Sequence, residues 1–168
     1  MVPVISITGR SGAGKTTLIE KLVSSLSVEG VKIGVIKHTR HHIDDGDEGK
    51  DSWRYRQAGA LGSVITSDRQ AVAHLAFTED VSPENLVMMM SPLVDLVIIE
   101  GYREGTQKKI EVIDESLDEA PLYKSGVKNI IALAADGIPP GEFKVFSRDD
   151  ITGLADFIMK ETGLVQGI

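Results

Sequence analysis

The sequence predicts a three-layer α/β fold with a mostly parallel central sheet, and three observations support it. Short apolar or β-branched segments alternate with segments of helical periodicity along the chain. The first apolar segment, residues 4–7, leads directly into a glycine-rich turn and then a helix. Residues 95–101 form a near-continuous apolar run ending in Glu100-Gly101, as central parallel strands do. No repeat or linker divides the chain, so residues 1–168 are expected to form one domain.

The glycine-rich turn is residues 9–16, Gly-Arg-Ser-Gly-Ala-Gly-Lys-Thr, which fits the P-loop spacing G-x-x-x-x-G-K-[ST]. Its glycines let backbone N–H groups turn toward an anion, and the helix that follows adds partial positive charge. The lysine can reach the β- and γ-phosphates, and the threonine hydroxyl can join a Mg²⁺ shell. A P-loop NTPase fold and a phosphate site are therefore predicted. The site residues are Gly9, Ser11, Gly12, Ala13, Gly14, Lys15, Thr16 and Thr17.

Helices are predicted at residues 17–27, 53–58, 83–90 and 149–162. The first carries leucines at helical spacing and stops before Gly30, which suits a left-handed cap. The second follows an Asp51-Ser52 cap, and the third follows a serine cap with proline at its first position. The last is amphipathic.

Strands are predicted at residues 4–7, 31–36, 61–66, 71–77, 95–101, 110–113, 129–134 and 143–146. The third and fourth should form a hairpin across residues 67–70, and the last should be an edge strand. In a parallel sheet, ligands bind beyond the carboxyl ends of the strands. The ligand crevice is therefore expected where the loops after Ile7, Ile36 and Ile99 converge.

Composition narrows the class of protein. Hydrophobic residues make up 42% and charged residues 26%, which is ordinary for a soluble globular protein. The absence of cysteine excludes disulfides, thiol catalysis and cysteine-based zinc sites. No apolar segment is long enough to cross a membrane and no leader is recognisable, so a cytoplasmic location is expected. The net charge of −7 argues against nucleic-acid or anionic-membrane partners.

Two charged residues close strands at the expected crevice. Glu100 ends a strongly apolar strand, where P-loop proteins keep the acid that orients Mg²⁺ or a water molecule. Asp95 lies at the other end of that strand, roughly 16 Å away at about 3.3 Å per residue, so Glu100 is preferred. Lys37 ends the second strand and could bind a phosphate or carboxylate there; the alternative is a solvated surface lysine.

The stretch from Lys37 to Lys50 is polar and aperiodic, and we expect a loop. Its histidines, His38, His41 and His42, suggest a metal site, but histidines in polar loops are more often solvated. Its acidic residues are expected to be solvated too. Asp51, just beyond, could reach Mg²⁺ when nucleotide binds.

The ordered set of motifs resembles the MobB family, the molybdopterin-guanine dinucleotide biosynthesis adaptor proteins. The resemblance extends nearly end to end and rests on residues 9–17, 34–39, 49–52, Arg54 and Arg56 with 58–60, 95–102 and 109–112. Two departures are Arg40, where the family often has a further histidine, and Ile113-Asp114-Glu115, where a basic residue is usual.

The resemblance implies a homodimeric protein that binds GTP and Mg²⁺ and has weak GTPase activity. Its partners would be molybdopterin and the molybdenum cofactor guanylyltransferase that joins GMP to it. Lys15, Glu100 and Asp51 would be the catalytic residues, and Thr16, Glu100 and Asp51 the metal ligands. Lys37 would be a cation in the crevice, and Asp136 resembles an acid near the base pocket.

Two other functions remain open from the residues alone. A small-molecule kinase would use Arg54 or Arg56 to clamp phosphate and Asp51 as a base. A metal-delivering GTPase would use the histidine loop. The sequence has no Asn-Lys-x-Asp signature, so its pattern does not identify the base.

Overall fold

The computed structural model describes residues 2–39, 43, 47–137 and 141–164. The chain forms two compact units, one of residues Met1–His38 and Pro83–Ile168, the other of residues Thr39–Ser82. The second is therefore an insertion between two parts of the first. That residues 1–168 act as one domain stays a prediction.

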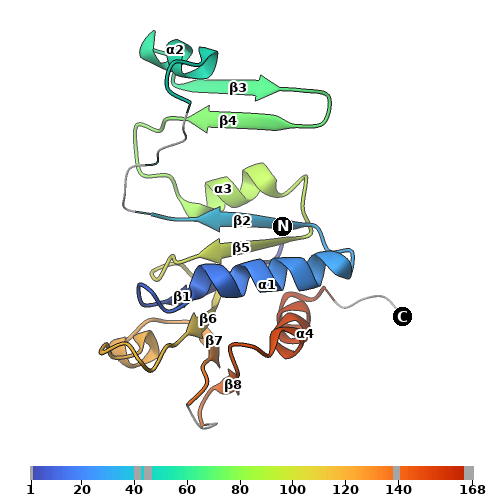
Figure 1. Ribbon diagram of the computed structural model, residues 1–168, viewed down its shortest axis with the longest axis vertical. Helices are drawn as coiled ribbons and strands as arrows, with labels where there is room; N and C mark the ends of the chain where they lie inside the picture. The colour runs from blue at the N-terminus through green and yellow to red at the C-terminus, as the bar shows by residue number, and fades with distance from the viewer. Residues whose placement is uncertain (1, 40–42, 44–46, 138–140, 165–168) are drawn as a thin grey trace. The chain divides into compact units, whose positions relative to one another are not determined.

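The first unit is built on a six-stranded sheet in the order β2-β5-β1-β6-β7-β8 (Figure 1). Its strands are β1 (Val4–Gly9), β2 (Ile33–Lys37), β5 (Leu96–Glu100), β6 (Lys108–Val112), β7 (Ile130–Ala134) and β8 (Lys144–Phe146). Each neighbouring pair is parallel, and β8 is an edge strand as expected. The predicted fold class is confirmed.

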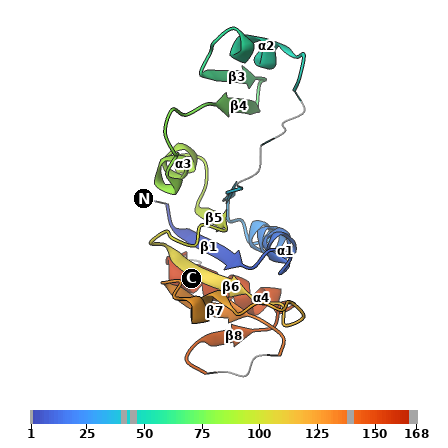
Figure 2. The same ribbon diagram turned by 90° about the vertical axis from the view of Figure 1, so that its left-hand side faces the viewer.

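Helices cover both faces of this sheet. They are α1 (Lys15–Val28), α3 (Pro83–Met90), α4 (Ile151–Thr162) and the short 3₁₀ helix η1 (Leu122–Ser125). The largest core lies under α1 and α4, where Leu22 and Leu154 are fully buried. On the opposite face, Val87 of α3 and Leu122 of η1 each anchor a smaller core. Figure 2 shows α1 and α3 on opposite sides of β5.

The central strand β5 explains the near-continuous apolar run in the sequence. All five of its residues are buried. Because successive side chains point to opposite faces, Leu96 and Ile98 join the core under α1, while Val97 and Ile99 join the core under α3. Burial on both faces thus brings Glu100 to the end of a rigid strand.

The second unit contains α2 (Asp51–Gln57) and an antiparallel hairpin of β3 (Gly62–Thr66) and β4 (Ala71–Leu75). The predicted turn closes with a 2.8 Å hydrogen bond from Ser67 N to Gln70 O. Asp47 anchors α2, because its buried carboxylate accepts from Ser52 Oγ at 2.7 Å and pairs with Arg56 at 2.7 Å. The hairpin forms a sheet of its own.

Each predicted helix and strand matches the structure to within two residues at either end. The predicted Asp51-Ser52 cap is wrong, because α2 already begins at Asp51 and its N-cap is Lys50, which makes no side-chain capping bond. Helix α1 begins at Lys15, two residues earlier than expected, because Gly14 serves as its N-cap with a left-handed backbone. The four-residue η1 is too short to show periodicity and was not predicted. Across the described ranges, no helix has the length and apolarity needed to span a membrane.

Candidate functional site

The P-loop joins β1 to α1 and takes a shape that depends on its glycines. Gly9 has φ of 147° and Gly14 has φ of 86°, a region that other residues rarely adopt. A Cβ at Gly9 would also overlap the carbonyl oxygen of Val112 on neighbouring β6. Gly14 has no capping side chain, so none competes with an anion for the first N–H groups of α1.

The ammonium of Lys15 folds back over this loop. Its Nζ donates to the carbonyl oxygens of Arg10 at 2.7 Å and Gly9 at 3.3 Å. Burial lowers the pKa of Lys15, Glu100 partly opposes that effect, and the charges of Arg103 and Lys37 lower the pKa further. The loop therefore holds a positive charge whose acceptors are neutral carbonyls, which is a suitable arrangement for binding a phosphate.

Thr16, Glu100 and Lys37 meet next to this lysine. The Thr16 hydroxyl lies 3.1 Å and 3.2 Å from the two Glu100 carboxylate oxygens, and Lys37 Nζ lies 3.2 Å from Glu100 Oε1. The Glu100 side chain is only 11% exposed. Hydroxyl and carboxylate oxygens are the ligands that Mg²⁺ takes, and a cation already lies against this carboxylate, so the pair fits a divalent metal.

Parallel register explains why these groups meet. Glu100 of β5 is the partner of Lys37 on one side and of Ile7 on the other. Strands β2 and β5 thus end side by side, and β1 continues two residues further, to Gly9 of the P-loop. The expected convergence of the loops after Ile7, Ile36 and Ile99 is confirmed. Asp95 lies at the opposite end of β5 and accepts from Lys32 N at 2.9 Å.

Two arginines that the motif does not specify lie at the P-loop, Arg10 within it and Arg103 beside it. Arg103, in the loop after β5, donates to the Gly9 carbonyl at 3.4 Å. Arg10 pairs with Glu119 at 3.1 Å and donates to the Ala120 carbonyl at 2.8 Å. In the sequence, Arg103 stands three residues after Glu100, and this position alone does not distinguish it from an ordinary loop arginine.

A buried acid, Glu111, lies near Arg10 of the P-loop and caps the short helix η1. Glu111 of β6 is 1% exposed and accepts from the backbone N–H groups of Leu122 and Tyr123, which caps η1. Burial raises the pKa of Glu111, while these hydrogen bonds and the charges of Arg10 and Arg103 lower it. Glu111 also lines a small pocket shared with Arg10 and Asp114.

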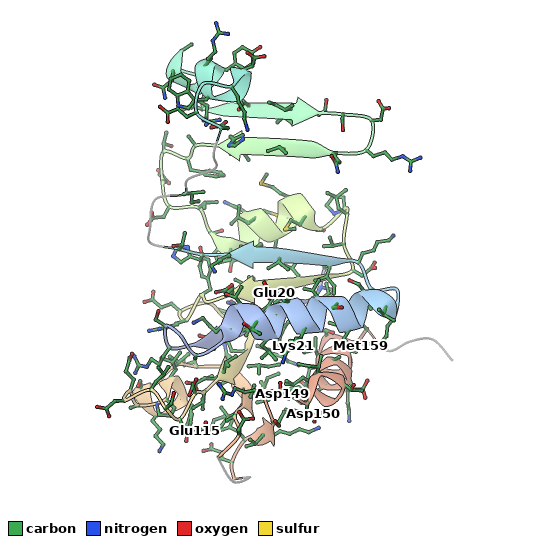
Figure 3. All side chains as sticks on the ribbon, viewed as in Figure 1. Glu20, Lys21, Glu115, Asp149, Asp150 and Met159 are labelled. Atoms are coloured by element: carbon green, nitrogen blue, oxygen red, sulfur yellow. The ribbon has the colours of Figure 1, made fainter. Side chains whose placement is uncertain are left out.

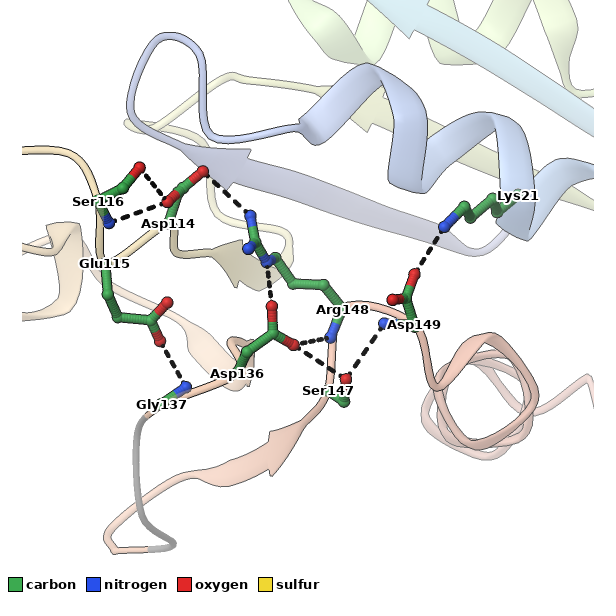
Figure 4. Close-up of polar contacts among 9 residues, drawn as sticks. All are labelled: Lys21, Asp114, Glu115, Ser116, Asp136, Gly137, Ser147, Arg148 and Asp149. Carbon is green, nitrogen blue, oxygen red and sulfur yellow. Dashed lines mark hydrogen bonds and ion pairs between the residues drawn. The ribbon is translucent and has the colours of Figure 1, made fainter.

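Asp136 follows β7 and belongs to a polar cluster at the ends of β6, β7 and β8 (Figure 4). Its carboxylate accepts from Ser147 Oγ at 2.9 Å and from Arg148 Nε at 2.6 Å. Arg148 also pairs with Asp114 at 3.2 Å. Hydrogen bonds from Arg148 lower the pKa of Asp136 and those from Ser116 lower the pKa of Asp114.

Arg148 engages both Asp136, the predicted acid near the base pocket, and Asp114. Both carboxylate oxygens of Asp136 already accept hydrogen bonds, so a base would compete with Arg148 for them. The base contact of Asp136 stays a prediction. Asp114, one of the departures from the family pattern, contributes the second acid to Arg148.

A separate ion pair links the two helices on this face. Lys21 of α1 lies 2.7 Å from Asp149, which precedes α4 (Figures 3 and 4). The Lys21 side chain is 46% exposed and that of Asp149 is 86% exposed. Lys21 is therefore a lysine of α1 whose ion pair lies outside the candidate phosphate site, which makes it a suitable control position.

Asp51 and the two arginines after it lie in the second unit. Asp51 is exposed and pairs with Arg54 at 3.5 Å, while Arg56 pairs with Asp47. Both arginines thus have acidic partners in their own unit, which does not favour the kinase alternative. The catalytic and metal roles of Asp51 stay predictions.

The histidine loop is described only in part. The ring centroids of His38 and Tyr102 lie 4.8 Å apart. Arg40, His41 and His42 lie outside the described residues. Within the ranges that the structure describes, no group of three or more histidine or acidic side chains is placed to hold a metal ion.

The sequence matches the model of one known protein family over most of its length. The model of the family described as molybdopterin guanine dinucleotide synthesis protein B, MobB, matches residues 4–136. The chain belongs to this family. The resemblance seen in the sequence is thereby confirmed, and the matched segment includes the whole site from Gly9 to Asp136.

Individual relatives match nearly the whole length of the chain, and the solved structures share its fold. The molybdopterin-guanine dinucleotide biosynthesis adapter protein of Escherichia coli K12 is 32% identical over 164 residues, covering 95% of this chain and 93% of that protein. A crystal structure of molybdopterin-guanine biosynthesis protein B is 28% identical with a TM-score of 0.69, covering 95% of this chain and 99% of the other. The Bacillus subtilis MobB structure is similar in fold, with a TM-score of 0.75 at 21% identity, covering 95% and 98%.

Proposed function

We propose that this chain is a GTP-binding adaptor with weak GTPase activity that assists molybdopterin guanine dinucleotide biosynthesis. It would assist the guanylyltransferase that joins GMP to molybdopterin. The observation that supports it best is the meeting of Lys15, Thr16 and Glu100 at the P-loop. Membership of the MobB family and the adapter name of the Escherichia coli relative support the biosynthetic role.

In this proposal the P-loop holds the triphosphate. Backbone N–H groups from Gly9 to Thr17 surround the phosphates, and the Lys15 ammonium exchanges its two carbonyl acceptors for phosphate oxygens. Arg103 lies close enough to Gly9 to add a second positive charge. Lys37 adds a third at the mouth of the crevice.

Thr16 and Glu100 would hold Mg²⁺, with Asp51 as a further candidate ligand. Bound there, the metal would neutralise charge on the β- and γ-phosphates. The Glu100 carboxylate is hydrogen-bonded to Thr16 in the nucleotide-free site. A carboxylate that holds a metal ion is a poor general base for water, which supports slow hydrolysis.

The remaining parts of the proposal concern partners and place. We propose a homodimer in the cytoplasm that contacts molybdopterin and the guanylyltransferase. The net charge of −7 supports the absence of nucleic-acid and anionic-membrane partners. The hairpin β3–β4 exposes apolar side chains suited to a contact between two copies, including Val64 at 59% and Leu75 at 43%.

Nucleotide binding is tested by unfolding the protein with GTP, GDP or ATP, with and without Mg²⁺. GTP with Mg²⁺ at one hundred times its dissociation constant should stabilise the fold by about 2.7 kcal/mol. Lys15→Ala should lose about 1.5–3 kcal/mol of binding because a charge-assisted contact is removed, with little change in apo stability. Lys21→Ala is the matched control, since its ion pair with Asp149 lies outside the phosphate site.

Equal stabilisation by GTP and ATP would contradict the guanine preference, and unaltered GTP affinity in Lys15→Ala would contradict the site. The adaptor role is tested by adding the protein to a reaction of guanylyltransferase, molybdopterin, GTP and Mg²⁺. Wild type and Lys21→Ala should raise the rate of dinucleotide formation, whereas Lys15→Ala should not. No acceleration by the wild type would contradict the role.

A further inference from the structure

The ammonium of Lys37 lies against both groups that the proposed function gives to Mg²⁺. Its Nζ is 3.2 Å from Glu100 Oε1 and 3.4 Å from Thr16 Oγ1. Thr16 Oγ1 is itself 3.1 Å from Glu100 Oε1. The three atoms therefore form a closed triangle, with the lysine nitrogen in the place of a cation.

The position of the Lys37 ammonium is explained by the negative charge of Glu100, which needs a nearby cation. A carboxylate as buried as that of Glu100 is costly unless a positive charge compensates it. The Lys15 ammonium is held by the carbonyls of Gly9 and Arg10, so among the described residues the cation in direct contact with Glu100 is that of Lys37.

Lys37 can also leave this position at little cost to the fold. It is the last residue of β2, and β2 is an edge strand of the sheet. Its side chain is 57% exposed, so the stem reaches solvent without opening the core. Two cations that both contact the same carboxylate and hydroxyl repel each other, so a metal entering this site excludes the ammonium.

We infer that Lys37 is a tethered cation that holds the metal position of the nucleotide-free site and is displaced when Mg²⁺ arrives with nucleotide. The inference rests on the proposed P-loop site and adds a role for one residue within it. Before Mg²⁺ arrives, Lys37 keeps Glu100 and Thr16 in place and supplies positive charge to the phosphates. Once Mg²⁺ is bound, that charge is redundant.

Removing this ammonium has opposite consequences with and without the metal. Lys37→Met keeps a stem of similar length but no charge. Without Mg²⁺, the variant should bind triphosphate roughly three- to tenfold more weakly than the wild type, since one charge-assisted contact is lost. With Mg²⁺, it should bind equally well or up to about threefold more tightly, because no ion pair has to be broken first.

The experiment is a calorimetric titration of full-length protein with GTP, once in EDTA and once in excess Mg²⁺. It compares wild type, Lys37→Met, Lys37→Arg and Lys21→Met. Lys37→Arg retains the charge and should keep the low Mg²⁺ dependence of the wild type. Lys21→Met removes a lysine of α1 that pairs with Asp149 and should match the wild type under both conditions. Thermal unfolding of each variant confirms that it is folded.

Two results would overturn the inference while leaving the proposed function standing. If Lys37→Met weakens binding equally in EDTA and in Mg²⁺, Lys37 is an ordinary phosphate contact. If it changes neither affinity, Lys37 is a surface lysine.

Inorganic tripolyphosphate is titrated in parallel because it lacks a base. If it binds and GTP does not, the guanine preference is wrong, and the Mg²⁺ dependence of tripolyphosphate binding then supports or overturns the role of Lys37. If neither ligand binds the wild type, both the proposed function and this inference are wrong.

Discussion

Lys15 carries its charge in a half-buried position where its hydrogen-bond acceptors are two neutral carbonyls. Burial lowers its pKa, and the charges of Arg103 and Lys37 lower it further, against the opposing effect of Glu100. An incoming phosphate supplies the negative charge that this group lacks. Phosphate binding and protonation of Lys15 are therefore coupled.

This coupling predicts that GTP binding takes up protons at alkaline pH. Because the pKa of Lys15 in the free protein lies below its ordinary value of 10.5 and the phosphate raises it, affinity is fully present below the free-state pKa. Affinity then falls as the pH rises through that pKa. Calorimetry in two buffers of different ionisation enthalpy should show an uptake of up to about one proton. Lys21→Ala should behave like the wild type, and heats that are independent of the buffer would contradict the prediction.

Part of the site could be predicted from single residues. The P-loop residues follow from a motif with a stated mechanism, and Glu100 and Lys37 follow from their places at strand ends. Arg103 could not be separated from an ordinary loop arginine, because its contact with Gly9 depends on tertiary structure. The same holds for Arg148, whose acidic partners come from the ends of two other strands.

At the scale of elements, apolar runs gave the strands to within a few residues. The order β2-β5-β1-β6-β7-β8 could not be derived, because periodicity records burial and not which strand lies beside which. That order is what brings Lys37 beside Glu100. Helix η1 was not predicted because it is a single short turn, and the acid that caps it, Glu111, lies on another element.

One face of the hairpin β3–β4 carries exposed apolar side chains, among them Val64 and Leu75. Val64 is paired with Ala73 and Gly62 with Leu75, so these residues share one face. A two-stranded sheet is marginally stable by itself, and among the described residues each strand has an unpaired edge. We propose that this face contacts a second copy of the chain.

A charge on this face should therefore weaken the dimer. Val64→Lys should shift the mass measured by light scattering from dimer toward monomer, with at least about a tenfold weaker association, because a charge is buried in an apolar contact. Leu93→Lys is the control, since Leu93 is 73% exposed and lies in the first unit. If Val64→Lys and Leu93→Lys show the same dimer mass, the hairpin is not the contact surface.

At the scale of the whole molecule, an acidic protein carries a locally basic site. The net charge is −7, yet Lys15, Lys37 and Arg103 lie around the P-loop. The family was recognisable because its motifs occur in order over nearly the whole chain. The boundary of the second unit was not, since the polar stretch that contains the junction at residues 38–39 equally fits an ordinary loop within one domain.

A crystal structure with a non-hydrolysable GTP analogue and Mg²⁺ would show where the triphosphate binds. We expect electron density for the phosphates against residues 9–17, with Mg²⁺ on the Thr16 hydroxyl and Lys37 moved away from Glu100. Phosphates bound elsewhere, with residues 9–17 empty, would show that the P-loop is not the nucleotide site.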